Sequence, residues 1–404
     1  MFQLSNIKKA RTFFNKFITS TKRNSTNIKV EVLNDIITHT IQFDKLGLRV
    51  LVEGEGIDFT PVVCNFNDWY KNLDLDKSVK ELEVIYNNGL YFNNNLIESQ
   101  PSKSGNGNWI SLCEIDAMVL NNAFYINAVA ASNGKLKVNS QTFFRLGNES
   151  VKIINTNDII LQECVIPNVS CDEFIFSINN EYIPILKKWI MFTNNLDFVN
   201  IYRLGNFVKF VANNDNISYE IICPINIGES INKVYNCLTH IIDCQYTGCK
   251  VTLNEDDMFQ KSVEESIAML LNGTKKVARK KIKEEFDKFS KNPDKIDAYK
   301  KLDKSIDVQY LNISSSVNDE NIYILRTLYQ SFISAINEFD YSIYYLNTKA
   351  NALIFGFKDE MFSFKTIFML RKPKEIIPEI NNSDLEIDDS EEIIVAEEDT
   401  FEPT

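Results

Sequence analysis

The chain has 404 residues, too many for one ordinary hydrophobic core, so two or three domains are expected. An apolar fraction of 44% is typical of a globular protein, and no apolar run approaches the ~20 residues of a membrane helix, which predicts a soluble protein. The net charge of −12 does not exclude a polyanion as a partner, because residues 374–404 contain twelve Asp or Glu and only one Lys. The rest, with 42 basic and 43 acidic side chains, is nearly neutral and could still meet a polyanion.

The start of the chain is basic. The first acid is Glu31, and seven basic side chains precede it. Leu4, Ile7, Phe14 and Phe17 have helical spacing, so residues 4–22 are predicted to form a helix with an apolar face. Another face repeats a cation every seven residues: Lys9, Lys16 and Arg23. A solvated surface or a mitochondrial transit peptide would also fit this acid-free segment.

A pattern of helix, strand, tight turn and strand then recurs along the chain. Asn or Asp opens each helix as an N-cap, and Asn-Gly or Gly-Asn supplies the positive φ of a hairpin turn. An upstream half, a helix followed by strands, precedes each copy. The three copies begin with short helices in residues 65–73, 178–192 and 317–336.

The upstream halves are predicted as a helix at 4–22 with strands in 28–53, a helix at 114–126 with strands in 127–166, and a helix at 255–271 with a longer insertion. In the insertion a basic cluster, including Lys276, Arg279, Lys280 and Lys283, lies opposite an apolar helix face. The fold class is therefore α+β, with three helix-backed antiparallel-sheet domains at residues 1–100, 101–234 and 235–373, and an acidic tail at 374–404 that is too charged to fold alone.

The sequence offers little for catalysis. There are two histidines, and no phosphate loop, nucleophile elbow or carboxylate cluster with metal-ligand spacing, so neither an enzyme nor a cofactor is expected. Eight scattered cysteines fit a reducing cytoplasm. Zinc remains an alternative for one group: Cys237, His240, Cys244 and Cys249.

Two short segments carry a family resemblance. LKVNSQTFFRL, which ends at Leu146, aligns without gaps to a family segment ending in Thr-Asp-Gly-His-Arg-Leu, with Phe143-Phe144 in place of Gly-His. IFMLR, Ile367 to Arg371, aligns to a C-terminal Ile-Met-Pro-Met-Arg. With the three repeats, these segments make the chain resemble the bacterial-type DNA sliding clamp, the β subunit of DNA polymerase III, encoded by a bacterium or a phage.

The resemblance implies a processivity factor of DNA replication in the cytoplasm, which is the host cytoplasm for a phage protein. Two chains would close head to tail into a homodimeric ring around double-stranded DNA, with helices inside and sheets outside. Basic helix faces would line the channel without reading sequence, and negative charge would lie outside. The candidates for the channel are Lys8, Lys9, Lys16, Arg23, Lys187, Lys188, Lys276, Arg279, Lys280 and Lys283.

The same resemblance implies a pocket where a hydrophobic peptide of a polymerase or clamp loader docks. Its walls would be the two aligned segments, which makes an exposed apolar site of six side chains: Phe144, Arg145, Leu146, Phe368, Met369 and Leu370. Taken without the alignment, these aromatic residues favour an ordinary sheet core. Two other classes stay open: a replication or transcription accessory subunit built on the Cys/His group, and a β-rich viral structural protein.

The acidic tail generates a first prediction. If its charge competes with DNA for the cationic helices, deleting residues 374–404 should increase retention on DNA at low salt, because a polyanion close to the site is removed. Retention at about 50 mM and 200 mM salt measures the effect, and a tail of equal length with its acids replaced by Gln or Asn is the matched control. Equal retention of all three proteins would leave the tail with a solubility role.

Overall fold

The computed structural model describes residues 1–43, 45–74, 78–102, 107–131, 141–157, 159–243, 249–250, 253–255, 310–315, 318–346 and 352–370. Among these residues, no helix combines the length and the apolar character needed to cross a membrane. The basic cluster at 276–283, residues 256–271 of the predicted helix and the acidic tail all lie outside the described residues.

The first repeat has two halves, each a helix with antiparallel strands. The first half contains α1 (Leu4–Asn15), the 3-10 turn η1 (Ser20–Ser25), β2 (Asn27–Leu33), β3 (Ile36–Phe43), β4 (Leu46–Glu53) and β5 (Phe59–Asn65). The second half contains α2 (Phe66–Lys71), β7 (Val84–Tyr86), β8 (Leu90–Phe92), β9 (Asn95–Ile97) and β10 (Ser99–Pro101). A short pair, β1 (Phe2–Gln3) with β6 (Glu81–Leu82), joins the halves. The segment after residue 92 thus contains two short strands, β9 and β10.

The second repeat follows the same plan. Its first half contains β11 (Ile110–Asp116), α3 (Ala117–Ala131), β12 (Gln141–Leu146), β13 (Ser150–Thr156), β14 (Ile160–Pro167) and β15 (Phe174–Asn179). Its second half contains α4 (Ile183–Thr193), β16 (Phe198–Leu204), β17 (Phe207–Asn214) and β18 (Ile217–Pro224). The helix predicted at 114–126 therefore begins three residues later and runs further.

The third repeat departs most from expectation. Its described elements are α5 (Glu229–Asp243), β19 (Cys249–Lys250), β20 (Leu253–Glu255), β21 (Tyr310–Ser315), β22 (Asn318–Leu325), α10 (Arg326–Ile336), β23 (Ser342–Leu346), β24 (Ala352–Lys358) and β25 (Ser363–Met369). The predicted helix at 317–336 is wrong in its first half, which pairs with β21 as strand β22. The boundaries expected at 100 and 234 fall inside β10 and α5.

Edge-to-edge pairing of strands joins the repeats. A nine-stranded sheet has the order β10-β5-β2-β3-β4-β18-β17-β16-β11, and an eight-stranded sheet has the order β15-β12-β13-β14-β25-β24-β23-β19. In the first sheet β4 of repeat one pairs antiparallel with β18 of repeat two; in the second β14 pairs with β25 of repeat three. Each junction contains six residue pairs, so the backbone groups at these edges are satisfied within the chain.

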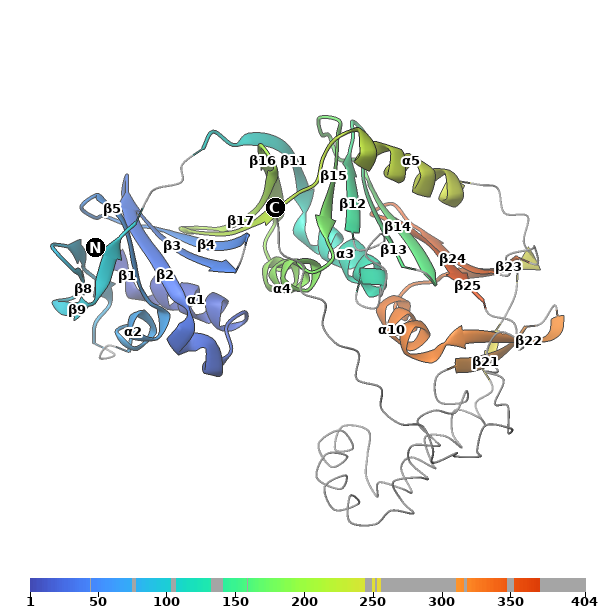
Figure 1. Cartoon of the computed structure of the whole chain (residues 1–404), viewed down its shortest axis with the longest axis horizontal. Helices are drawn as coiled ribbons and strands as arrows, with labels where there is room; N and C mark the ends of the chain where they lie inside the picture. The colour runs from blue at the N-terminus through green and yellow to red at the C-terminus, as the bar shows by residue number, and fades with distance from the viewer. Residues whose placement is uncertain are drawn as a thin grey trace, which may run out of the picture.

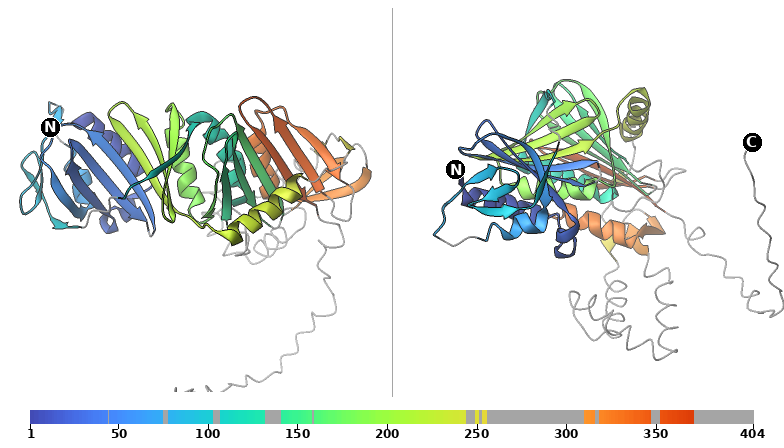
Figure 2. Two further views of the ribbon diagram at one scale, coloured as in Figure 1. Left: turned by 90° about the horizontal axis from the view of Figure 1, so that it is seen from above. Right: turned by 60° about the vertical axis from the view of Figure 1, so that its left-hand side comes forward.

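The helices form one layer beneath the sheets. In Figures 1 and 2, α1, α4, α3 and α10 lie on the same side, whereas α5 lies on the opposite side of the eight-stranded sheet. The α1 helix buries Leu4, Ile7, Ala10, Phe13 and Phe14. The Phe13 ring is 5.0 Å from Phe192 of α4, measured between centroids, so the helix layer is continuous across the first junction.

Local turn chemistry follows the sequence closely. The Asn65 side chain accepts a hydrogen bond from the Asn67 N–H and caps α2. Asn88 and Gly205 have φ of 55°, as expected for the two hairpin turns. The α4 helix differs, because its N-cap is Tyr182 and no side chain caps it; Pro184, in the first turn, has no N–H to satisfy.

Charged rows cross both junctions on the face of the sheets away from the helix layer. In the nine-stranded sheet Arg49 lies 3.1 Å from Glu220, and Glu220 also accepts from Lys209 at 3.0 Å. In the eight-stranded sheet Glu163 is paired in register with Lys365 and lies 3.7 Å from Lys152. Burial raises the pKa of Glu163, against the effect of the two lysines. The exterior here alternates in sign and is not uniformly negative.

The buried His39 of β3 makes stability sensitive to acid. It packs on Trp69, with ring centroids 5.2 Å apart, and burial lowers its pKa to about 3. The folded protein thus keeps His39 neutral, while the unfolded chain takes up a proton below about pH 6.5. The free energy of unfolding is therefore unaffected by His39 above pH 6.5. It decreases by up to about 1.4 kcal/mol per pH unit as the pH falls from 6.5 toward 3.

We expect His39→Leu to flatten the dependence of the unfolding midpoint on pH between 6 and 4. Thermal unfolding followed by circular dichroism measures it. The matched control is His240→Leu, on the exposed surface of α5, which should leave the slope unchanged. An equal slope in wild type and His39→Leu would contradict the assignment.

Candidate nucleic-acid interface and partner site

The exposed side of α1 carries part of the expected cationic row. Because its buried residues pack toward the sheet, the opposite stripe contains Lys9, Thr12 and Lys16, all exposed. Lys9 and Lys16 are two turns apart, about 10 Å along the helix axis. Lys8 is half-buried at the side of this stripe. The exposed lysines therefore lie on the side of α1 opposite its buried residues.

Arg23 is held by an aromatic ring. Its guanidinium lies 4.2 Å from the centroid of Tyr70 and donates to Asn15 Oδ1 at 3.1 Å. Arg11 lies 4.7 Å from the same ring and pairs with Asp74. The sequence reading missed Arg11 as a candidate, since it does not share the seven-residue spacing, although it belongs to the same acid-free segment.

On α4 the two candidate lysines differ. Lys188 is exposed, whereas the Lys187 ammonium lies 3.9 Å from the centroid of Tyr125 on α3. Partial burial lowers the pKa of Lys187. The neighbouring α3 contains no charged residue, and it exposes Met118 and Tyr125 on the same layer. The candidate channel residues that the structure describes therefore lie on α1, η1 and α4 or at their ends.

Three of the six side chains expected in the partner pocket belong to the hydrophobic core. Phe144 is 1% exposed and stacks 5.0 Å from Phe176, and Leu146 is fully buried. Phe368 is buried 5.1 Å from Phe332. Arg145 forms a surface ion pair with Glu173 at 3.0 Å. The expectation of one exposed site containing Phe144, Leu146 and Phe368 is therefore wrong, and β13 and β14 separate the two segments in the sheet.

The reason lies in the cover on both faces of β12. Phe144 points toward α3, where it stacks 6.2 Å from Phe124. Phe143 points to the other face, where it packs with Tyr235 and Ile242 of α5. A strand covered on both faces has no solvated side, so its sequence is apolar at consecutive positions. The Phe143-Phe144 pair is thus a packing feature.

Met369 and Leu370 lie instead beside the turn that precedes β14. The Met369 N–H donates to Ile159 O at 2.7 Å, and Ile160 is paired with Phe368. Met369 is 41% exposed, and Ile159 and Leu370 are partly buried. Together they form a small apolar surface at the second junction.

Asn157 sets the shape of that turn. Its Oδ1 accepts from the N–H groups of Ile159 and Ile160, both at 2.9 Å, and its Nδ2 donates to Ala130 O in α3 at 3.1 Å. This side chain therefore ties the turn to the helix layer. The surrounding residues 156–161, TNDIIL, also open with Thr and end with Leu, a signal that the gapless alignment passed over.

The arrangement of repeats matches solved structures over nearly the whole chain. The β clamp of Helicobacter pylori in complex with diflunisal superposes with a TM-score of 0.58 at 9% identity, covering 92% of this chain and 99% of the clamp. A DNA polymerase III β chain from Streptococcus pneumoniae gives a TM-score of 0.59 at 11% identity, covering 92% and 98%. The chain has the sliding-clamp fold. No protein-family model matches the sequence, and no curated protein is detectably similar to it.

A third clamp structure concerns partner binding. The H. pylori β clamp bound to a DNA ligase peptide matches with a TM-score of 0.54 at 11% identity, covering 92% of this chain and 99% of that one. In this chain residues 156–161, and not β12, lie beside the end of β25. The apolar side chains at this junction are Ile159, Leu161, Met369 and Leu370.

Two members of the possible zinc group lie on α5. Cys237 and His240 are both exposed there, and Cys244 lies outside the described residues. Within the described part of the chain, His, Cys, Asp and Glu side chains form no cluster of three that could hold a metal ion.

The stability of two variants tests whether Phe144 and Met369 belong to the core or to an exposed surface. Phe144→Ala should destabilise the fold by about 3–5 kcal/mol, because it leaves a cavity between Phe124 and Phe176. Met369→Ala should change stability by only about 0.5 kcal/mol, since Met369 is 41% exposed and lies at the surface. Denaturant unfolding of both variants measures this. Similar destabilisation by the two substitutions would show that Met369 belongs to the core and would contradict its assignment as a docking residue.

Proposed function

We propose that the protein is a DNA sliding clamp, a non-enzymatic processivity factor that encircles duplex DNA and tethers a polymerase. The observation that carries the proposal is the continuous helix layer, which presents Lys9, Lys16 and Lys188 to solvent in a chain with the sliding-clamp fold. Exposed lysines on helices suit loose contact with phosphates, which tethers without reading base sequence. Lys276, Arg279, Lys280 and Lys283 stay candidates for the same channel.

The ring needs a second copy of the chain. One chain supplies three repeats and two internal junctions, and two head-to-tail chains supply the six repeats of a closed ring. We propose the homodimer on this count and on the clamp structures to which the chain is similar. The cytoplasm, or the host cytoplasm for a phage protein, is the compartment in which such a clamp would act.

A hydrophobic peptide is the proposed means of partner attachment. Met369, Leu370 and Ile159 provide an apolar surface at the second junction, shaped by the Asn157 turn. The peptide of a polymerase or a clamp loader would insert apolar side chains there and exclude water. Arg145 lies on β12, which β13 and β14 separate from β25, and would serve at the rim.

The decisive experiment compares retention of the protein on circular and on linear DNA. A clamp should remain on nicked circular plasmid after gel filtration and should be lost when a restriction enzyme linearises that plasmid, because only a closed circle holds a ring. Equal loss from circular and linear DNA would contradict encirclement. Closed rings in negative-stain electron microscopy would support encirclement independently.

The channel assignment generates a matched charge-reversal pair. Lys9→Glu with Lys188→Glu should shorten retention on circular DNA several-fold and reduce its dependence on salt, because two phosphate contacts become repulsive. The control reverses Lys233 and Lys358, which are exposed on the sheet side of the protein. It carries the same change in net charge and should behave like wild type. Equal effects from both pairs would point to total charge and away from a channel.

A further inference from the structure

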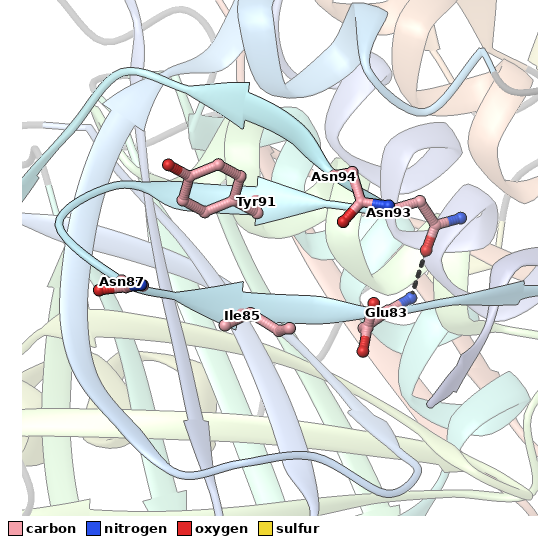
Figure 3. Close-up of a pocket in the computed structure, with 6 residues that line it drawn as sticks. All are labelled: Glu83, Ile85, Asn87, Tyr91, Asn93 and Asn94. Atoms are coloured by element: carbon pink, nitrogen blue, oxygen red, sulfur yellow. Dashed lines mark hydrogen bonds between the residues drawn. The ribbon is translucent and has the colours of Figure 1, made fainter.

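Two further features of the described residues lie away from the helix layer and the second junction. The first is a hollow of about 200 Å³ on the small sheet of the first repeat, lined by Glu83, Ile85, Asn87, Tyr91, Asn93 and Asn94 (Figure 3). The residues that line it include no thiol and no imidazole, and the Asn93 Oδ1 already accepts a hydrogen bond from the Glu83 N–H. The second feature is a pair of thiols in the second repeat, which supplies reactive groups that the hollow lacks.

The thiols of Cys113 and Cys171 contact each other inside the second repeat. The Cys113 S–H donates a hydrogen bond to the Cys171 Sγ. The two residues are 6% and 5% exposed, and both are free cysteines. Ser170 and Asp172, on either side of Cys171, are exposed. Cys171 therefore lies just beneath the surface of the protein.

The pair connects two different sheets. Cys113 belongs to β11, which is an edge strand of the nine-stranded sheet, and Cys171 lies in the loop between β14 and β15 of the eight-stranded sheet. The two sheets meet at this place, because the Arg203 guanidinium of β16 lies 4.3 Å from the ring centroid of Phe174 in β15. A covalent bond between the two sulfurs would therefore fasten one sheet to the other.

A bulge in β11 comes immediately before Cys113. The strand pairs Ser111 with Tyr202 and Cys113 with Ile201, so Leu112 is the extra residue. An extra residue rotates the side chains that follow it relative to a regular strand. Leu112 and Cys113 are accordingly both buried, although they are adjacent in the strand. The bulge thus accounts for the orientation of the Cys113 thiol toward the loop that contains Cys171.

The two sulfurs differ in their readiness to ionise. The hydrogen bond from Cys113 lowers the pKa of Cys171, and the Gly147 N–H lowers it further, against the opposite effect of burial. The same contact, together with burial, raises the pKa of Cys113. Cys171 is therefore the nucleophile of the pair. Burial raises the pKa of Cys164 and Cys223, which keeps these thiols protonated and inert.

We propose that Cys113 and Cys171 form a reversible disulfide when the protein meets a peroxide, and that this bond fastens the two sheets of the second repeat together. The Cys171 thiolate attacks one oxygen of hydrogen peroxide; an S–O bond forms, the O–O bond breaks, and the other oxygen leaves as water after taking up a proton. The Cys113 thiol then attacks the sulfur of this sulfenic acid. The S–S bond forms, the S–O bond breaks, and a second water leaves with the proton of Cys113. Two electrons pass from the sulfurs to the peroxide, and a thiol reductant returns them.

The disulfide would close a loop of the chain that contains α3 and β12–β14. Such a cross-link reduces the entropy of the unfolded chain, so the oxidised protein should resist unfolding better than the reduced one. Cys113 and Cys171 lie outside the cationic helices α1 and α4 and outside the apolar surface at Met369. The thiol pair therefore goes beyond the proposed clamp function and does not depend on it.

Peptide mapping of the full-length protein after treatment with hydrogen peroxide tests the proposal. We expect a cross-linked pair of peptides that contain Cys113 and Cys171, about 2 Da lighter than the two thiol peptides together. The unfolding midpoint should rise by several degrees, and dithiothreitol should reverse the rise. Cys171→Ser should abolish both effects. The matched control is Cys237→Ser, which removes an exposed thiol on α5 and should behave like wild type.

Two results would overturn the proposal. One is alkylation of both Cys113 and Cys171 after peroxide treatment that oxidises the exposed Cys237; the other is a cross-link that leaves the unfolding midpoint unchanged. If Cys171→Ser does not fold, the mapping and the midpoints of the reduced and oxidised wild type decide the question by themselves. Loss of the protein from circular DNA would contradict the clamp function and leave the thiol pair standing, so the two failures are distinguishable.

Discussion

The pairing of sheet edges is the constraint on which this structure depends. A strand at an open edge leaves N–H and C=O groups without partners, so each half-repeat needs a neighbour along its edge. The chain meets this need twice within itself, at β4 with β18 and at β14 with β25. Both junctions create sheets longer than one repeat could build.

The helix layer leaves the other face of the sheets open. Over the eight-stranded sheet α5 covers that face, and its residues Tyr235 and Ile242 pack against Phe143 and Ile154. The strand beneath is thereby buried on both sides. Elsewhere the open face is stabilised by ion pairs such as Arg49 with Glu220, in which half-buried charges find partners across a junction. The same sheet architecture therefore uses an added helix in one place and paired charges in another.

Charge is distributed along the same layers. Among the described residues Lys9 and Lys16, on the exposed stripe of α1, have no carboxylate partner, while the sheet face alternates acids with bases. The chain as a whole is acidic because of residues 374–404, so total charge describes the body poorly. A polyanion would meet a local field set by the helices, since screening in water limits the reach of distant charge to about 10 Å. For such a polyanion the local arrangement of charge therefore matters more than the net charge.

The sequence by itself determined the repeated units and most of their turns. Asn65, Asn88 and Gly205 act through local backbone geometry, which needs no distant contact, and each has the predicted role. The helical spacing of Leu4 and Ile7 likewise sufficed for the start of α1, but the helix ends at Asn15 and not at residue 22 as predicted. Tertiary structure alone decided three things: that 318–325 pairs as a strand, that α5 covers Phe143, and that residues 156–161 lie beside Met369. Each depends on contacts between segments far apart in the chain, so nothing in the local pattern distinguishes a buried aromatic pair from an exposed one.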